Sequence, residues 1–142
     1  MTGRTAIYNA RLLDPASGLD ANGGILIENG LITDIGVGIT KATTADVKID
    51  AKGKALAPGL IDLRVKTGEP GAENKETLET AGDAAAAGGV TTFIVMPDTD
   101  PVLDSVALVD FIKRRADSVA KVKVLPTGGL TIDLDGAKMS EI

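Results

Sequence analysis

The pentapeptide Asp62-Leu63-Arg64-Val65-Lys66 contains the residues of this chain whose types and spacing come nearest to a chemical site. It has the form of an Asp-x-His-x-His metal-binding strand, with arginine and lysine in place of the two histidines. A neutral imidazole offers a lone pair to a metal, whereas a guanidinium has none free and an ammonium must first lose a proton. The pattern therefore indicates the place of a metal site whose usual ligands are missing.

The composition removes the commonest replacement ligands, because the 142 residues include no histidine and no cysteine. Carboxylates remain as the strong candidates. Fifteen basic and twenty acidic residues give a net charge of −5, so there is no electrostatic case for binding nucleic acid or an anionic membrane. The N-terminus lacks the apolar core of a signal peptide, and no apolar run approaches the ~18 residues of a membrane span. We therefore expect a cytoplasmic protein.

The pattern of apolar residues changes near residue 57, which predicts a β layer over residues 1–57 and a second piece over residues 58–142. In the first piece, Ile25–Glu28 and Leu31–Ile35 flank Asn29-Gly30. This dipeptide favours the positive φ angles of a tight hairpin turn, so the two segments are predicted to pair. Further strands are expected at Ala6–Leu13 and Asp46–Asp50.

Residues 58–142 alternate strand, helix, strand, helix, strand, which favours a parallel sheet with crossover helices. The expected strands are Leu60–Lys66, Thr91–Met96 and Val122–Leu125. The first helix is predicted to begin at Lys75, with Asn74 as its cap, and to end at Gly88-Gly89.

The second helix is predicted over Asp104–Val119, where Val106, Leu108, Val109 and Ile112 recur at helical spacing. The basic triplet Lys113-Arg114-Arg115 lies near its C-terminal end, where positive charge complements the helix dipole. We interpret the triplet as a solvated helix end and not as a nucleic-acid site.

Period-two geometry places Asp62, Arg64 and Lys66 on one face of the first strand, with the apolar residues between them on the face toward the helices. In a closed barrel the polar face looks inward, and the end near Lys66 lies at the rim where the loops after the strands build active sites. In an edge strand with one wet face, Arg64 and Lys66 are ordinary solvated bases. The strand pattern alone leaves both interpretations open.

Several segments occur in the order typical of one enzyme family: Ala57–Lys66, Glu69–Gly71, Lys75–Thr80, Ala84–Thr92 and Met96–Thr99. Together with the N-terminal β layer, they resemble the beginning of a dihydroorotase, of the class associated with aspartate carbamoyltransferase in the cyclic amidohydrolase superfamily. Such enzymes combine a small β-sandwich with an eight-fold β/α barrel and reversibly cyclise carbamoyl aspartate to dihydroorotate at a zinc site. The resemblance implies an α/β chain with a β-sandwich layer and the first three βα-type units of an incomplete barrel.

The resemblance also implies which functional residues of the family are replaced in this chain. The histidine ligands of the family align with Arg64 and Lys66, the arginine that clamps the substrate carboxylate aligns with Gly68, and an asparagine aligns with Asp98. Gly68 lacks a charge-assisted donor, and Asp98 places a carboxylate near that of the substrate. The family's backbone glycines and prolines are kept. We therefore expect no catalytic residue, no metal ligand and no cofactor in this chain, although the family uses zinc.

The two bases could have acquired a new use. Arg64 and Lys66 could hold an anion, or could pair with Asp62, Glu69 or Asp98 in an internal ion-pair network that replaces the positive charge of the metal. We favour the network, because perturbed ion pairs are more often structural than ligand-binding.

Three βα-type units cannot close an eight-stranded barrel, which takes ~250 residues, so we expect a fragment of a longer polypeptide. Our preferred function is a non-catalytic, dihydroorotase-like partner of aspartate carbamoyltransferase in pyrimidine biosynthesis, by family analogy. The alternatives are an active amidohydrolase whose remaining metal ligands lie beyond Ile142, and a module that binds a small anion. Homo-oligomers are also compatible with the sequence.

Overall fold

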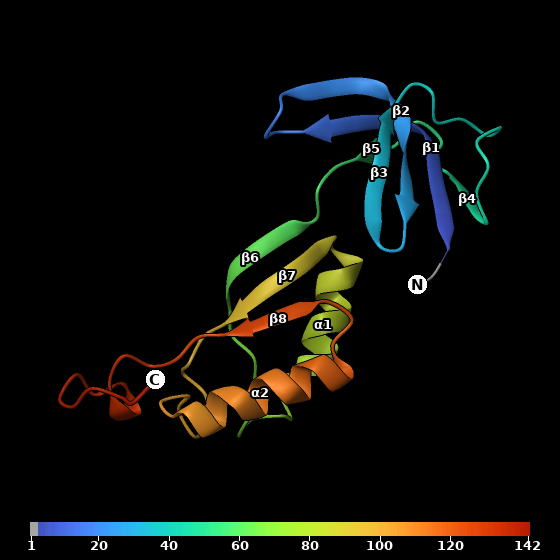
Figure 1. Cartoon of the computed structure of the whole chain (residues 1–142). Helices are drawn as coiled ribbons and strands as arrows, with labels where there is room; N and C mark the ends of the chain where they lie inside the picture. The colour runs from blue at the N-terminus through green and yellow to red at the C-terminus, as the bar shows by residue number, and fades with distance from the viewer. Residues whose placement is uncertain (1–2) are drawn as a thin grey trace. The chain divides into compact units, whose positions relative to one another are not determined.

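The computed structural model describes residues 3–142, which form two compact units that divide between Pro58 and Gly59 (Figure 1). The first unit consists of strands and the second alternates strands with helices. Within residues 3–142 no helix has the length and apolar character needed to cross a lipid bilayer.

The first unit is the predicted β layer, a five-stranded sheet in which β1 is central. Antiparallel pairs join β1 to β2 and β2 to β3, while the short strands β4 and β5 lie parallel to β1. The sheet order is β3-β2-β1-β4, with β5 also paired to β1. The strand bounds are β1 Arg4–Asp14, β2 Leu19–Glu28, β3 Leu31–Gly36, β4 Val47–Asp50 and β5 Ala55–Leu56.

The predicted hairpin is confirmed at Asn29-Gly30. Glu28 of β2 pairs with Leu31 of β3, so these two residues form the whole connection. Asn29 has φ 52° and Gly30 has φ 82°, the left-handed conformation that a two-residue hairpin turn requires.

The second unit confirms the predicted alternation of strands and helices. Its three strands are parallel in the order β6-β7-β8, and each crossover carries one helix. The bounds are β6 Leu60–Val65, α1 Leu78–Ala87, β7 Val90–Val95, α2 Val106–Val119 and β8 Lys123–Pro126, followed by a short 3₁₀ segment at Ile132–Leu134.

One core joins the helices to the sheet in this unit. Helix α1 packs on β7 and α2 packs on β8, and the two helices also contact each other. The side chains at the centre of this core are completely or almost completely buried: Leu78, Phe93, Val95, Leu103 and Ile112. Burying apolar side chains of this size supplies ~1.5–3 kcal/mol each, so this core fixes the loops that follow β6 and β7.

Helix α1 begins later than the sequence predicts. Its N-cap is Thr77 and not Asn74, because Thr77 and Thr80 form a reciprocal capping box. The Thr80 N–H donates to the Thr77 hydroxyl over 3.1 Å, and the Thr77 N–H donates to the Thr80 hydroxyl over 3.0 Å. Lys75, the predicted first residue, instead belongs to a turn in which its N–H donates to the Ala72 carbonyl. The predicted end of the helix at Gly88 is confirmed.

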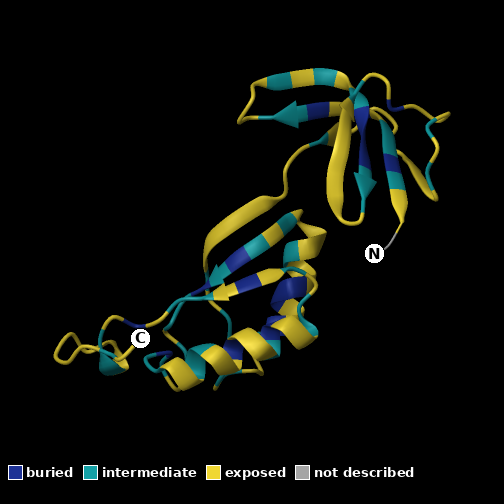
Figure 2. Ribbon diagram, in the orientation of Figure 1, coloured by how far each residue is buried: buried dark blue, intermediate teal, exposed yellow. Residues whose placement is uncertain are grey.

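The predicted burial of the apolar face of β6 is wrong for two of its three residues. Ile61 is 63% exposed and Leu63 is 68% exposed, whereas Val65 packs against the core. Figure 2 shows β6 mostly in the colour of exposed residues. The physical reason is the sheet order, since β6 is the outer strand in the described residues and the helices pack on β7 and β8. Lys66 lies one residue past the end of the strand.

Candidate functional site

Three of the predicted site residues lie together where β6 and β7 end. The Met96 N–H donates to the Val65 carbonyl over 2.9 Å, which keeps the two strand ends side by side. Residues that follow the strands, among them Lys66, Gly68 and Asp98, line an open cleft of about 390 Å³. In a parallel sheet, the carboxyl ends of the strands are where the loops build binding sites, so this cleft is the candidate site.

An ion pair joins the two strand ends across this cleft. The Lys66 ammonium donates to a carboxylate oxygen of Asp98, with the two side chains 65% and 36% exposed. Its hydrogen bond with Lys66 lowers the pKa of Asp98 below the ordinary value, with a smaller contribution from the charge of Arg64. Asp98 is therefore ionised at neutral pH and pairs with the positive charge of Lys66.

Asp62 and Arg64 contribute less than the predicted network requires. Asp62 accepts a hydrogen bond of 3.0 Å from the Arg64 backbone N–H, not from its guanidinium. Within the described residues Arg64 takes part in no ion pair of 4.0 Å or less, and its effect on Asp98 is Coulombic only. Of the expected network, the structure brings together Lys66 and Asp98 as a direct pair, with Arg64 nearby.

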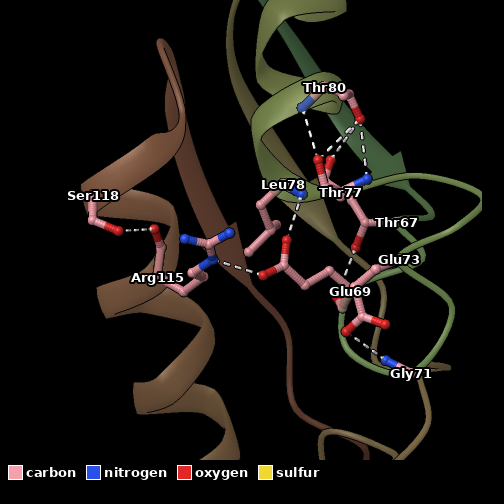
Figure 3. A network of polar contacts seen from close by, with 9 residues as sticks. All are labelled: Thr67, Glu69, Gly71, Glu73, Thr77, Leu78, Thr80, Arg115 and Ser118. Atoms are coloured by element: carbon pink, nitrogen blue, oxygen red, sulfur yellow. Dashed lines mark hydrogen bonds and ion pairs between the residues drawn. The ribbon is translucent and has the colours of Figure 1, made fainter.

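Glu69 was expected in the same network but has other partners. Its carboxylate accepts a 2.7 Å hydrogen bond from Nε of Arg115 in α2 and a 2.9 Å hydrogen bond from the backbone N–H of Leu78 (Figure 3). Glu69 is 6% exposed and is the one buried charged residue within residues 3–142. Glu69 pairs with these groups because it lies beside the first free N–H of α1 and the Arg115 guanidinium, which supply the donors that a buried carboxylate needs.

Arg115 is a partner of Glu69 that the sequence did not lead us to expect. We interpreted Lys113-Arg114-Arg115 as a solvated helix end, and this holds for the first two residues, which are exposed. Arg115 is half-buried, and its charge pairs with Glu69, whose hydrogen bond raises the pKa of the guanidinium. Helical spacing carried the signal, because Arg115 lies three residues after the fully buried Ile112 and so shares its face.

The donor set at this cleft does not fit a divalent metal. Neither the Arg64 guanidinium nor the Lys66 ammonium, which pairs with Asp98, has a free lone pair. No group of three or more His, Cys, Asp or Glu side chains that could hold a metal ion occurs in the part of the chain that the structure describes. At this cleft, Lys66 and Asp98 pair with each other.

The arrangement of strands and loops can be compared with known proteins. A family model described as Dihydro-orotase-like matches residues 53–142. The chain belongs to the dihydroorotase-like family. The dihydroorotase of Pelobacter propionicus is 39% identical over 136 residues, which are 96% of this chain and 32% of that protein. The dihydroorotase of a Wolbachia species from Drosophila simulans is 45% identical over 121 residues, 85% of this chain and 27% of that protein.

Solved structures of hydantoinases, which belong to the amidohydrolase superfamily, are similar to this dihydroorotase-like chain. L-Hydantoinase (dihydropyrimidinase) from Arthrobacter aurescens superimposes with a TM-score of 0.80 at 30% identity, over 89% of this chain and 28% of that one. A D-hydantoinase gives a TM-score of 0.68 at 25% identity, over 87% and 26%. The expected fold class is thus confirmed as the N-terminal portion of an amidohydrolase barrel protein. This chain spans about a third of the length of the curated relatives.

The Lys66–Asp98 pair predicts a pH-dependent contribution to stability. Because the pKa of Asp98 is lowered by folding, its contribution is present above the unfolded pKa of about 3.9 and is lost as the pH falls through the lower folded pKa. We expect Asp98→Asn to lower the free energy of unfolding by ~0.2–1 kcal/mol at pH 7 and by progressively less below about pH 4. Denaturant titrations across this pH range measure the difference.

The matched control for Asp98 is Asp110→Asn, which changes an exposed carboxylate of α2 that makes no ion pair within the described residues. It should leave stability within about 0.5 kcal/mol of the unmodified protein at each pH. An Asp98→Asn effect that is the same at pH 3 and pH 7 would show that the ion pair contributes nothing.

The Glu69 contacts predict that two neighbouring arginines differ in their effect on stability. Arg115→Ala leaves a buried carboxylate with one remaining donor, and we expect it to lower the free energy of unfolding by ~1–3 kcal/mol. Arg114→Ala removes an exposed arginine of the same helix and should cost no more than about 0.5 kcal/mol. Equal losses in the two variants, measured by urea unfolding, would contradict the role of the Glu69–Arg115 pair.

Proposed function

We propose that this protein is a dihydroorotase-like protein without zinc-dependent hydrolase activity, and that it acts in the cytoplasm as a structural or regulatory partner of aspartate carbamoyltransferase in pyrimidine biosynthesis. The observation that carries the proposal is the ion pair between Lys66 and Asp98. These residues take positions that the family resemblance assigns to a metal ligand and to substrate binding. A lysine ammonium has no free lone pair for zinc, and this one is paired with a carboxylate.

The proposal also accounts for the contrast between scaffold and site. The chain keeps 39% and 45% identity to proteins named dihydroorotase, and its strands and helices superimpose on those of an L-hydantoinase. A retained fold with an altered site is what selection for assembly, without selection for chemistry, is expected to leave. The choice of aspartate carbamoyltransferase as the partner rests on analogy with the family class.

An active amidohydrolase is the second candidate, favoured by the name that the relatives carry. It would have to hold its metal with ligands outside the 142 residues of this chain. A binding module for a small anion is a weaker candidate, because the Lys66 charge that would attract the anion is already paired with Asp98. Only the enzyme predicts turnover, so an activity assay separates it from the other two.

The test of lost activity is the interconversion of dihydroorotate and carbamoyl aspartate by the full-length protein in the presence of zinc. We expect no zinc-dependent turnover, and no difference between the unmodified protein and Lys66→Ala, because the lysine has no catalytic role to lose. Zinc-dependent turnover by the unmodified protein that falls in Lys66→Ala would overturn the proposal and favour the enzyme.

The test of partnership is co-purification with the aspartate carbamoyltransferase of the same cell. We expect the two proteins to elute together, and the carbamoyltransferase to lose assembly or activity when this protein is deleted. A carbamoyltransferase that assembles and works normally in the deletion strain would reject the partner role, whatever the result of the turnover assay.

A further inference from the structure

We propose that the loop after β6 is closed by its own main chain at Gly68, so that this position can accept no side chain. The family resemblance that underlies the proposed function makes position 68 a former substrate-binding position, and the inference rests on the proposed function for that identity alone. The closure itself follows from contacts within the loop. Its consequence is that the loss of substrate binding is built into the backbone and is separate from the loss of the metal ligands.

The backbone of the following turn occupies the space beside Gly68. A Cβ built on Gly68 would lie 2.7 Å from the carbonyl oxygen of Glu76 and closer still to that of Ala72. Both neighbours are main-chain atoms, which cannot rotate away as the end of a flexible side chain can. The Ala72 N–H also donates to the Gly68 carbonyl over 2.5 Å, so the approach of the two segments is fastened by a hydrogen bond.

The loop is anchored at the two residues that follow Gly68. After Gly68, the carboxylate of Glu69 binds the Leu78 N–H and Arg115, which holds the chain against α1 and α2 (Figure 3). Beyond it, the Asp100 N–H donates to the Pro70 carbonyl over 3.2 Å, which ties the same loop to the segment after β7. Moving the turn away from Gly68 would therefore disturb contacts to two helices and to a second loop.

A side chain at position 68 has no low-cost alternative arrangement under these constraints. Overpacking against fixed neighbours typically destabilises a protein even when the added group is small. An arginine there would need the turn from Ala72 to Glu76 to open before its guanidinium could reach a carboxylate in the cleft. Restoring the charge alone is thus not expected to restore substrate binding.

Gly68→Ala tests the closure with the smallest possible side chain. We expect the unfolding equilibrium constant to rise ~5- to 150-fold, and the Ala72 amide to lose protection against hydrogen exchange. Gly88→Ala is the matched control, because Gly88 has φ −85° and a Cβ there meets only ordinary contacts of 3.5 Å and more. Gly68→Ala with the stability and amide protection of the unmodified protein would overturn the closure.

Gly68→Arg tests the consequence for binding, with carbamoyl aspartate as the probe. We expect this variant to be less stable than the unmodified protein and to gain no thermal stabilisation from the probe. A variant that keeps its stability and is stabilised by carbamoyl aspartate would show that the loop opens freely. These outcomes are independent of zinc-dependent turnover by the unmodified protein, so failure of the closure and failure of the proposed function can be told apart.

Discussion

The hydrogen bonds of the buried Glu69 carboxylate are the contacts on which the structure around the cleft depends. Burying an ionised carboxylate is costly unless donors surround it, and here the first N–H of α1 and the guanidinium of Arg115 supply them. The same contacts fix where α1 begins, how α2 lies beside the loop after β6, and how closely that loop turns at Gly68. The cleft between the ends of β6 and β7 takes its wall from this anchored loop.

Beside this wall, the charged side chains of Lys66 and Asp98 contact each other. In a metal-dependent amidohydrolase the metal supplies a concentrated positive charge that organises the strand ends. Here the Lys66 ammonium, paired with Asp98, supplies a positive charge at the same rim. Main-chain atoms of Ala72 and Glu76 pack closely against Gly68 in the same loop. Both features occur in a chain that keeps the fold of the N-terminal portion of an amidohydrolase barrel.

The sequence predicted correctly the turns and helix ends that depend on the backbone preferences of one or two neighbouring residues. The Asn29-Gly30 turn and the end of α1 at Gly88 follow from backbone preferences of single residues, and the structure confirms both. The start of α1 was misplaced because its cap depends on Thr77 and Thr80 acting together and on Glu69, nine residues before Leu78. The same limit explains Arg115, whose partner lies 46 residues away, and Ile61, whose burial depends on neighbours that pattern cannot reveal.

We infer that contacts within the protein hold the ends of β6 and β7 and their loops in place without a metal. The most direct test is the zinc content of the full-length protein after incubation with zinc and dialysis, measured by elemental analysis. We expect zinc well below one equivalent per chain, and no change in thermal stability when a chelator is added. One equivalent of zinc that survives dialysis, and whose removal destabilises the protein, would contradict it.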